Sequence, residues 1–258
     1  MQRLWTAWAI VLCCGPFGGA DPGVVQKTET LPLRGHTQSL HVFGVAGDRP
    51  VIVSSGDGGW LHLGPHVAHL LAAHGYYVLG FDVKAYLESF TSGSSTLNAA
   101  EEPADFRALS EFAREGSSSK PILVGISEGA GLSVLAASDP LTRKSIGGVV
   151  AIGLPDRNEL GWRWKDSVIY LTHGVPNEPT FSAASFVGQV APVPLALLHS
   201  THDEFVPLSD AQRMLGLAAE PRRMWVVNAA DHRFSDNLSV FDQNLLEALD
   251  WVSQHEPR

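Results

Sequence analysis

Short, uninterrupted apolar runs recur along this 258-residue chain, and segments with helical spacing separate them. A strand without polar–apolar alternation is typical of a parallel sheet that helices cover on both faces. The pattern therefore predicts an α/β fold, a doubly wound domain with a mostly parallel sheet. The apolar runs are PVIVSS (50–55), YYVLGFD (76–82), PILVGIS (121–127), IGGVVAIGLP (146–155), VPLALLHST (193–201) and RRMWVVN (222–228).

Helices are expected between these strands. Apolar residues recur at helical spacing in 63–75 and 101–116, and both segments end at a glycine. The composition of 128–138 is also helix-forming, and a last helix is expected over about 237–252. Before the first parallel strand, HTQSLHVFGVAG (36–47) is typical of a strand pair or an edge hairpin.

Residues 156–191 interrupt the strand–helix rhythm, so we interpret them as a small cap insertion over the carboxyl ends of the strands. The segment is rich in aromatic residues, which suit either an apolar wall for an acyl chain or packing onto the sheet. We expect Trp162 and Trp164 of this segment, together with Trp60, to contact substrate.

The first twenty residues have the pattern of a secretory signal peptide. Arg3 precedes an apolar run over 4–14, and Gly-Gly-Ala at 18–20 is a suitable cleavage site. The run is too short to cross a bilayer as a helix, and an N-terminal anchor or a buried strand is the alternative interpretation. We therefore expect a periplasmic or secreted protein whose mature hydrolase domain spans 21–258.

The mature chain would be acidic and without cysteine. Removal of 1–20 takes away both cysteines and Arg3, leaving 17 Lys+Arg against 27 Asp+Glu, so 17 − 27 gives a net charge of −10. The absence of a basic run argues against nucleic acid and against tight electrostatic binding to anionic lipids. About 238 residues can still build a sizeable core without disulfides.

The motif GISEGAG (125–131) contains G-x-S-x-G at the end of a predicted strand and the start of a predicted helix. In that context the pattern predicts a serine nucleophile on a sharp turn, with an acid and then a histidine further along the chain. A structural turn serine is the alternative for a match this short. We predict that Ser127 is the nucleophile.

Two further strand ends supply the expected partners of the serine. Asp203 follows the strand at 193–201, and His232 follows the strand at 222–228. Carboxyl ends of parallel strands meet at one edge, so the fold can bring the three side chains together. A base and an orienting carboxylate are what a serine hydroxyl needs to become nucleophilic. Glu204 and Asp156 remain alternatives for the acid.

Backbone N–H groups are expected to stabilise the oxyanion. One belongs to Glu128, directly after the nucleophile; the other belongs to Asp57 or Gly58 in the glycine-rich loop SGDGGW (55–60). A phosphate-binding loop is excluded because no G-x-x-x-x-G-K-[ST] pattern is present. The carboxylates of Glu128 and Asp57 either point away from the reacting centre or bind a cationic acyl group.

The remaining histidines are given structural interpretations. His62, His66 and His69 recur at spacings of four and three, but no H-E-x-x-H pattern accompanies them, so a helix surface is favoured over a metal site. His199 is expected to pack in the core, and His202 to support the Asp203 loop. No metal or cofactor is expected.

The combination of GDGGW, GYYVLGFDVKAYL and G-x-S-x-G resembles the AcvB/VirJ family of bacterial virulence-associated α/β-hydrolases over about residues 50–252. The resemblance implies the α/β-hydrolase fold, export and acyl-hydrolase chemistry. It also implies lipid-linked aminoacyl esters as substrates, transient contact with a membrane surface and a secretion-system partner. In the family elbow an aromatic residue and an aspartate are common where this chain has Glu128 and Gly131.

The sequence thus predicts an exported serine hydrolase that cleaves a carboxylic ester of a small molecule or lipid through an acyl-enzyme. The alternatives are a hydrolase-fold accessory protein without turnover and a serine peptidase.

Overall fold

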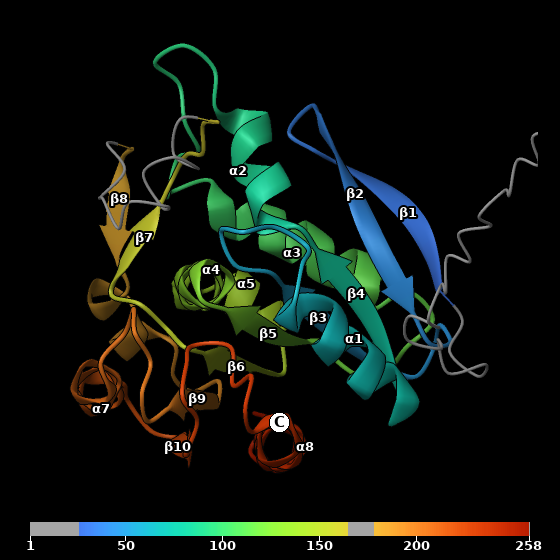
Figure 1. Cartoon of the computed structure of the whole chain (residues 1–258). Helices are drawn as coiled ribbons and strands as arrows, with labels where there is room; N and C mark the ends of the chain where they lie inside the picture. Colours follow the sequence, from blue (N-terminus) through green and yellow to red (C-terminus); the bar gives the residue numbers. More distant parts are fainter. Residues whose placement is uncertain (1–25, 165–177, 258) are drawn as a thin grey trace, which may run out of the picture.

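The computed structural model describes residues 26–164 and 178–257. In this part of the chain, eight strands form one sheet in the order β1-β2-β4-β3-β5-β6-β9-β10 (Figure 1). The neighbouring strands from β4 to β10 run parallel, so the predicted mostly parallel sheet is confirmed. The strands are β1 (Gln26–Leu33), β2 (His36–Phe43), β3 (Arg49–Ser54), β4 (Tyr76–Phe81), β5 (Ile122–Ile126), β6 (Gly148–Ile152), β9 (Leu195–Ser200) and β10 (Arg222–Val227).

The sheet begins with an antiparallel hairpin that the sequence predicts only in part. β2 falls within the expected 36–47 segment, but its partner is β1, which precedes it, and β2 also pairs antiparallel with β4. β1 is mostly exposed and has little apolar patterning, because it is the edge strand of the sheet. Pairing with β2, rather than burial of side chains, holds this strand in place.

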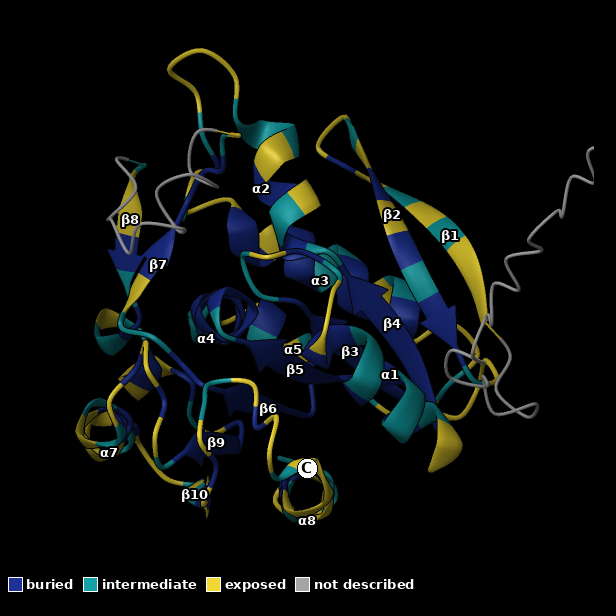
Figure 2. Cartoon of the chain, in the orientation of Figure 1, coloured by how far each residue is buried: buried dark blue, intermediate teal, exposed yellow. Residues whose placement is uncertain are grey.

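Helices cover both faces of the sheet, as the continuous apolar strands predict (Figures 1 and 2). Helices α1 and α8 pack on one face, where Val67 and Leu71 join a core with Phe241 and Leu245. The second core holds apolar side chains of α2, α3, α4 and α7 on the other face. The helices are α1 (Leu63–Ala73), α2 (Val83–Phe90), α3 (Glu102–Ala113), α4 (Glu128–Ser138), α5 (Thr142–Ser145), α7 (Leu208–Leu217) and α8 (Leu238–Gln254).

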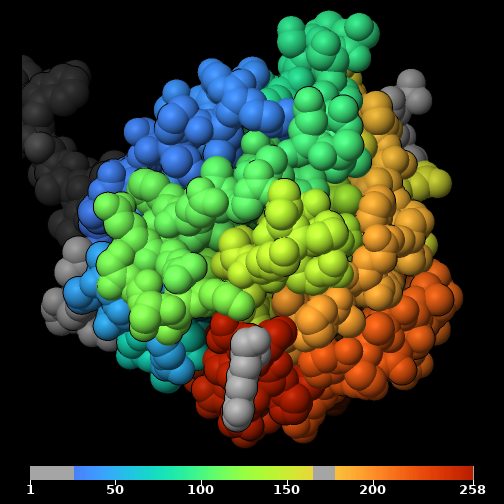
Figure 3. All heavy atoms as spheres, turned by 180° about the vertical axis from the view of Figure 1, so that it is seen from behind, coloured from blue at the N-terminus to red at the C-terminus, as the bar shows by residue number. Residues whose placement is uncertain are grey.

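Different elements lie at the amino ends and at the carboxyl ends of the parallel strands. Seen from behind, the green and yellow-green surface of the middle of the chain adjoins the red surface of its C-terminal end (Figure 3). At the carboxyl ends of the strands lie the segments that follow β3, β5, β9 and β10. These segments contain the predicted nucleophile, acid, base and oxyanion donors. Within the described ranges, none of the helices is both long and apolar enough to cross a bilayer.

The 156–191 segment leaves the sheet after β6. Its described part forms a short antiparallel pair of β7 (Arg157–Glu159) and β8 (Thr180–Ser182), followed by two 3-10 turns, η1 (Ala183–Ser185) and η2 (Val187–Gln189). β7 packs onto the start of α4: a Cβ on Gly131 would lie 1.8 Å from Asn158 Oδ1. Gly131 is therefore required where β7 crosses the helix. The predicted signal peptide and residues 165–177 of this segment lie outside the described residues.

Candidate active site

Ser127 stands on a strained turn between β5 and α4, with φ 51° and ψ −114°. Residues with a side chain rarely take a positive φ, because the Cβ crowds the backbone. A Cβ on Gly125 would lie 2.2 Å from the carbonyl oxygen of Gly129. One on Gly129 would lie 2.5 Å from the carbonyl oxygens of Ser54 and Ser55. The predicted strand–turn–helix context of the motif is confirmed, and close packing explains its glycines.

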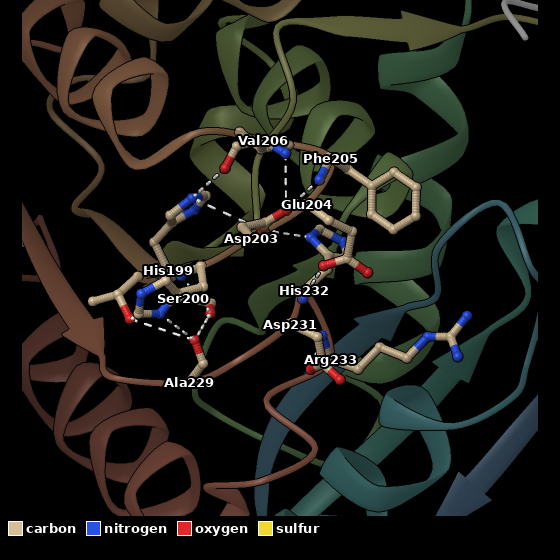
Figure 4. Close-up of polar contacts among 12 residues, drawn as sticks. His199, Ser200, Asp203, Glu204, Phe205, Val206, Ala229, Asp231, His232 and Arg233 are labelled. Carbon is tan, nitrogen blue, oxygen red and sulfur yellow. Dashed lines mark hydrogen bonds and ion pairs between the residues drawn. The ribbon is translucent and has the colours of Figure 1, made fainter. Parts of the chain in front are cut away.

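The buried carboxylate of Asp203 pairs with the half-buried imidazole of His232 (Figure 4). Asp203 Oδ2 lies 2.6 Å from His232 Nδ1, while Oδ1 accepts hydrogen bonds from the N–H groups of Phe205 and Val206 at 2.9 and 2.8 Å. Burial by itself would raise the pKa of Asp203, but His232 and the two N–H groups outweigh it and hold that pKa below its usual value. Asp203 is therefore an ionised acceptor that orients the imidazole.

The imidazole of His232 also lies next to the backbone that holds Ser127. The N–H of Ser127 donates to the carbonyl oxygen of Ile152 at 2.8 Å. A Cβ on the following residue, Gly153, would lie 2.5 Å from His232 Cε1 and 3.3 Å from its Nε2. Among the described residues, Ser127 Oγ and His232 Nε2 form no hydrogen bond, and such bonds are often long before substrate binds. The three side chains converge on one edge of the sheet, an arrangement that suits acyl transfer by serine.

The two other candidates for the acid have different partners. Glu204 accepts a hydrogen bond from the backbone N–H of His232 at 2.7 Å, so it holds the loop rather than the ring. The carboxylate of Asp156 accepts hydrogen bonds from Ser182 Oγ and the N–H of Ala184 at 2.6 and 3.0 Å. Asp156 therefore ties the two ends of the insertion together.

His199 and His202 support the Asp203 loop. His199 is buried, contacts the carbonyl oxygen of Val206 through Nε2 at 2.8 Å, and lies 3.8 Å from Asp203 Oδ2. Burial lowers the pKa of His199, which favours the neutral ring in this position. His202 Nδ1 lies 3.1 Å from the carbonyl oxygen of Ala229, on the loop that leads to His232. His199 is thus buried, as predicted, and also contacts the Asp203 loop, whereas His202 joins that loop to the one before His232.

The glycine-rich loop lies beside the serine. A Cβ on Gly56 would lie 3.4 Å from Ser127 Cβ, and the N–H of Gly59 closes a tight turn onto the carbonyl oxygen of Gly56 at 3.1 Å. Within the described part of the chain, the N–H groups of Asp57, Gly58 and Glu128 donate to no protein acceptor. They are free to bind the oxygen of a ligand, as the prediction of an oxyanion site requires.

The expectation that the Glu128 side chain points outward is wrong. Glu128 is buried, and its Oε1 accepts a hydrogen bond from the N–H of Glu159 at 2.6 Å. Burial, reinforced by the nearby Glu159 carboxylate, raises the pKa of Glu128 well above its usual value. The side chain therefore links the turn at Ser127 to the insertion, and its burial disfavours the charged form.

The three tryptophans expected to contact substrate have different environments. Trp60 stacks on His41 at 4.8 Å and covers Gly80, where a Cβ would lie 2.3 Å from its ring, so it is a packing residue of the sheet. Trp162 is 6% exposed and belongs to the core, which corrects its expected place in an open apolar wall. Trp164 is 71% exposed, and it alone of the three presents most of its surface to solvent.

The histidines of α1 have separate partners. His66 Nε2 lies 2.6 Å from Asp242 Oδ1 on α8, and the ring of His69 packs edge-on against Phe43. His62 precedes the helix with a φ of 53°. Among the residues that the structure describes, no cluster of three or more metal-ligating side chains occurs.

Two residues near the serine were not predicted from the sequence. Ser55 Oγ accepts a hydrogen bond from the N–H of Val83 at 3.1 Å and so joins the glycine-rich loop to the start of α2. Lys84 lies next in the chain, with its ammonium 4.0 Å from the centre of the Trp162 ring. The segment FDVKAYL has no local motif that would mark Lys84, because its significance depends on an insertion that begins seventy residues later.

The order of strands, the turn at Ser127 and the covered parallel sheet define an α/β-hydrolase fold. Residues 48–157 match the family model described as "Bacterial virulence protein (VirJ)", which confirms the predicted resemblance over that segment. The matched segment contains the glycine-rich loop and Ser127, whereas Asp203 and His232 lie beyond it.

Comparisons with individual proteins agree on the fold. Uncharacterized protein YfhR of Escherichia coli K12 is 30% identical over 61 residues, a stretch that covers 23% of this chain and only 22% of YfhR. The esterase Pf2001 of Pyrococcus furiosus superposes with a TM-score of 0.67 at 19% identity, covering 92% of this chain and 94% of the esterase. A putative dienelactone hydrolase from Klebsiella pneumoniae gives 0.64 at 16% identity, covering 88% and 98%. At such identities the likeness to solved structures is one of fold.

Proposed function

We propose that this protein is a serine hydrolase that cleaves carboxylic esters through an acyl-enzyme intermediate. The observation that carries the proposal is the Asp203–His232 pair, whose imidazole lies beside the strained turn of Ser127. The same side chain types in this order along the chain are the ones that activate a serine on a strand-to-helix turn.

In the proposed reaction, Ser127 Oγ attacks the carbonyl carbon of the ester while His232 Nε2 takes the hydroxyl proton. The oxyanion that forms accepts hydrogen bonds from the N–H of Glu128 and from the N–H of Asp57 or Gly58. Collapse of this intermediate expels the alcohol, which receives the proton from His232. Water then attacks the acyl-enzyme with His232 as base, and the carboxylic acid leaves as Ser127 regains its proton.

The finer parts of the proposal rest on sequence. An aminoacyl ester of a phospholipid is the substrate that the family resemblance favours, with contact to a membrane surface and a secretion-system partner. For a cationic acyl group, Asp57 is the candidate partner, since Glu128 is already bonded to the Glu159 backbone. Comparison of lysyl and alanyl esters with uncharged acyl esters tests this assignment. Periplasmic or secreted location is proposed from the signal-peptide pattern of 1–20.

The decisive test is covalent labelling of the mature chain with a fluorophosphonate, followed by mass spectrometry of the labelled peptide. We expect a single label on Ser127, none after Ser127→Ala, and normal labelling after substitution of the exposed Ser94 by alanine. A parallel panel of esters and matched amides measures turnover. Absence of labelling in folded protein would favour an accessory role without turnover, and faster amide cleavage would favour a peptidase.

A further inference from the structure

Lys84 lies one tight turn away from the candidate nucleophile. A Cβ on Gly56 would touch Ser127, the Gly56–Gly59 turn is closed by a hydrogen bond, and a Cβ on Gly59 would lie 3.5 Å from Lys84 Cδ. The Ser55 hydroxyl fixes the N–H of Val83, directly before Lys84. The lysine stem is therefore held against the loop that carries two of the expected oxyanion donors.

The ammonium of Lys84 rests on an aromatic ring and has no acidic partner. Its Nζ lies 4.0 Å from the centre of the Trp162 ring, and within the described residues no carboxylate lies within ion-pair distance of it. The nearby Asp82 is occupied as the N-cap of α2, where it accepts from the N–H of Ala85 at 3.1 Å. A half-buried cation on an aromatic face is attracted to it, but its positive charge stays available to an anion.

A second donor at the same place also lacks an acceptor. Trp162 is buried and anchored through its backbone N–H to Thr91 Oγ1 at 3.1 Å, yet its indole Nε1–H has no hydrogen-bond partner among the described residues. Buried donors are nearly always paired, so this indole is an exception among the described residues. Of the two groups, Lys84 is the half-buried one, and its stem lies beside the glycine-rich loop.

From these contacts we propose that Lys84 binds an anionic group of the ester substrate and so determines the specificity of the site. The inference rests on the proposed ester hydrolysis and adds the charge of the substrate to it. The shared chemistry is a carboxylate or a phosphodiester close to the scissile ester. Lys84 acts on substrate binding and orientation, and no proton transfer is assigned to it.

The test compares matched esters that differ in charge. 4-Nitrophenyl butyrate is the neutral ester, and mono-4-nitrophenyl glutarate carries a carboxylate on the acyl half. 3-Carboxy-4-nitrophenyl butyrate carries a carboxylate on the alcohol half. The butyryl ester of 2-hydroxyethyl methyl phosphate carries a phosphodiester there, and its neutral reference is 2-methoxyethyl butyrate, which has a similar leaving group. We expect the wild type to prefer at least one anionic ester by about tenfold in kcat/KM, which corresponds to about 1.4 kcal/mol. The favoured ester identifies the anion and its half of the substrate.

Variants of Lys84 separate binding from folding. Lys84→Gln should lower kcat/KM for the favoured anionic ester about tenfold more than for the neutral ester, and Lys84→Arg should keep most of the preference. Substitution of the exposed Lys144 by glutamine is the matched control and should leave the preference intact. High salt should weaken the preference, since the interaction is electrostatic. A wild type without preference for any anionic ester, or a preference that survives Lys84→Gln, overturns the proposal.

A binding experiment gives an answer even if turnover fails. Monomethyl glutarate and dimethyl phosphate are titrated calorimetrically into Ser127→Ala, with and without Lys84→Gln. If either anion binds, and Lys84→Gln weakens its binding about tenfold, the anion site is supported. This conclusion holds even if the protein hydrolyses none of the esters. Equal affinities, or no binding of either anion, overturn it independently of the labelling of Ser127.

Discussion

Substitution of Asp203 by asparagine tests how the structure controls the proton on His232. In the folded protein, Oδ1 of Asp203 accepts two backbone N–H groups, from Phe205 and Val206, and Oδ2 faces His232 Nδ1. An asparagine at this position keeps its oxygen on the two N–H donors, because its amide nitrogen cannot accept them. The amide nitrogen must then face His232 Nδ1 and donate to it.

This orientation reverses the tautomer of the imidazole. With Nδ1 as an acceptor, the proton of neutral His232 moves to Nε2, which can then no longer take the proton of Ser127. Loss of the correct tautomer in a serine–histidine–aspartate site costs about four orders of magnitude in kcat. We therefore expect kcat for a short nitrophenyl ester to fall about 10⁴-fold at pH 7, with little change in KM.

Steady-state kinetics and the rate of fluorophosphonate labelling both measure this loss. Asp156→Asn and Glu204→Gln are the matched controls, because both carboxylates bond to backbone or hydroxyl groups rather than to the imidazole. Glu204→Gln can still accept from the N–H of His232 and should cost less than about tenfold. If Asp203→Asn keeps more than a tenth of the activity, or Asp156→Asn is the more damaging variant, the assignment of the acid is refuted.

Three further predictions concern the nucleophile, a buried acid and the insertion. Ser127→Ala should lower kcat by about four or more orders of magnitude with an unchanged circular dichroism spectrum; retention of a tenth of the activity would disprove its role. Burial, reinforced by Asp105, raises the pKa of Glu102. The stability that this group contributes is therefore complete at pH values below the ordinary pKa of glutamate, and it is lost as the pH rises toward the pKa of Glu102 in the folded protein. Urea unfolding at pH 5, 6 and 7 should therefore show a shallower fall for Glu102→Gln, by up to about 1.4 kcal/mol per pH unit, while the exposed Glu111→Gln parallels the wild type; parallel curves for both variants would contradict the prediction. Trp162→Ala should cost about 3–5 kcal/mol of unfolding free energy and Trp164→Ala less than about 0.5, and equal losses would show that their burial is misassigned.

Local sequence patterns predict most of the central fold. Strands β3, β4, β5, β6 and β9 are continuous apolar runs because both faces of the sheet are covered. Each of these strands can therefore be predicted without knowing which strands lie beside it. The turn at Ser127 can also be predicted from the sequence, because the close packing of a strand and a helix requires glycines at fixed sequence spacings from the serine. The edge strand β1 cannot be predicted in this way, because backbone pairing holds it in place and its side chains are mostly exposed.

The partners of polar side chains were decided only in the tertiary structure. The sequence predicts Asp203 and His232 from their positions at strand ends, but it leaves Glu204 and Asp156 as alternative acids. Only the hydrogen bonds show that Asp203 faces the imidazole and that the other two carboxylates have other partners. For Glu128 the sequence leaves an outward-pointing and a cation-binding side chain as alternatives, and it is buried because an insertion thirty residues away covers it and supplies a backbone N–H. Periodicity reports how a residue relates to its own helix or strand, whereas hydrogen bonds and burial depend on distant segments that the fold brings alongside. For that reason the turn at Ser127 can be predicted from the sequence, and the surroundings of Glu128 and Lys84 cannot.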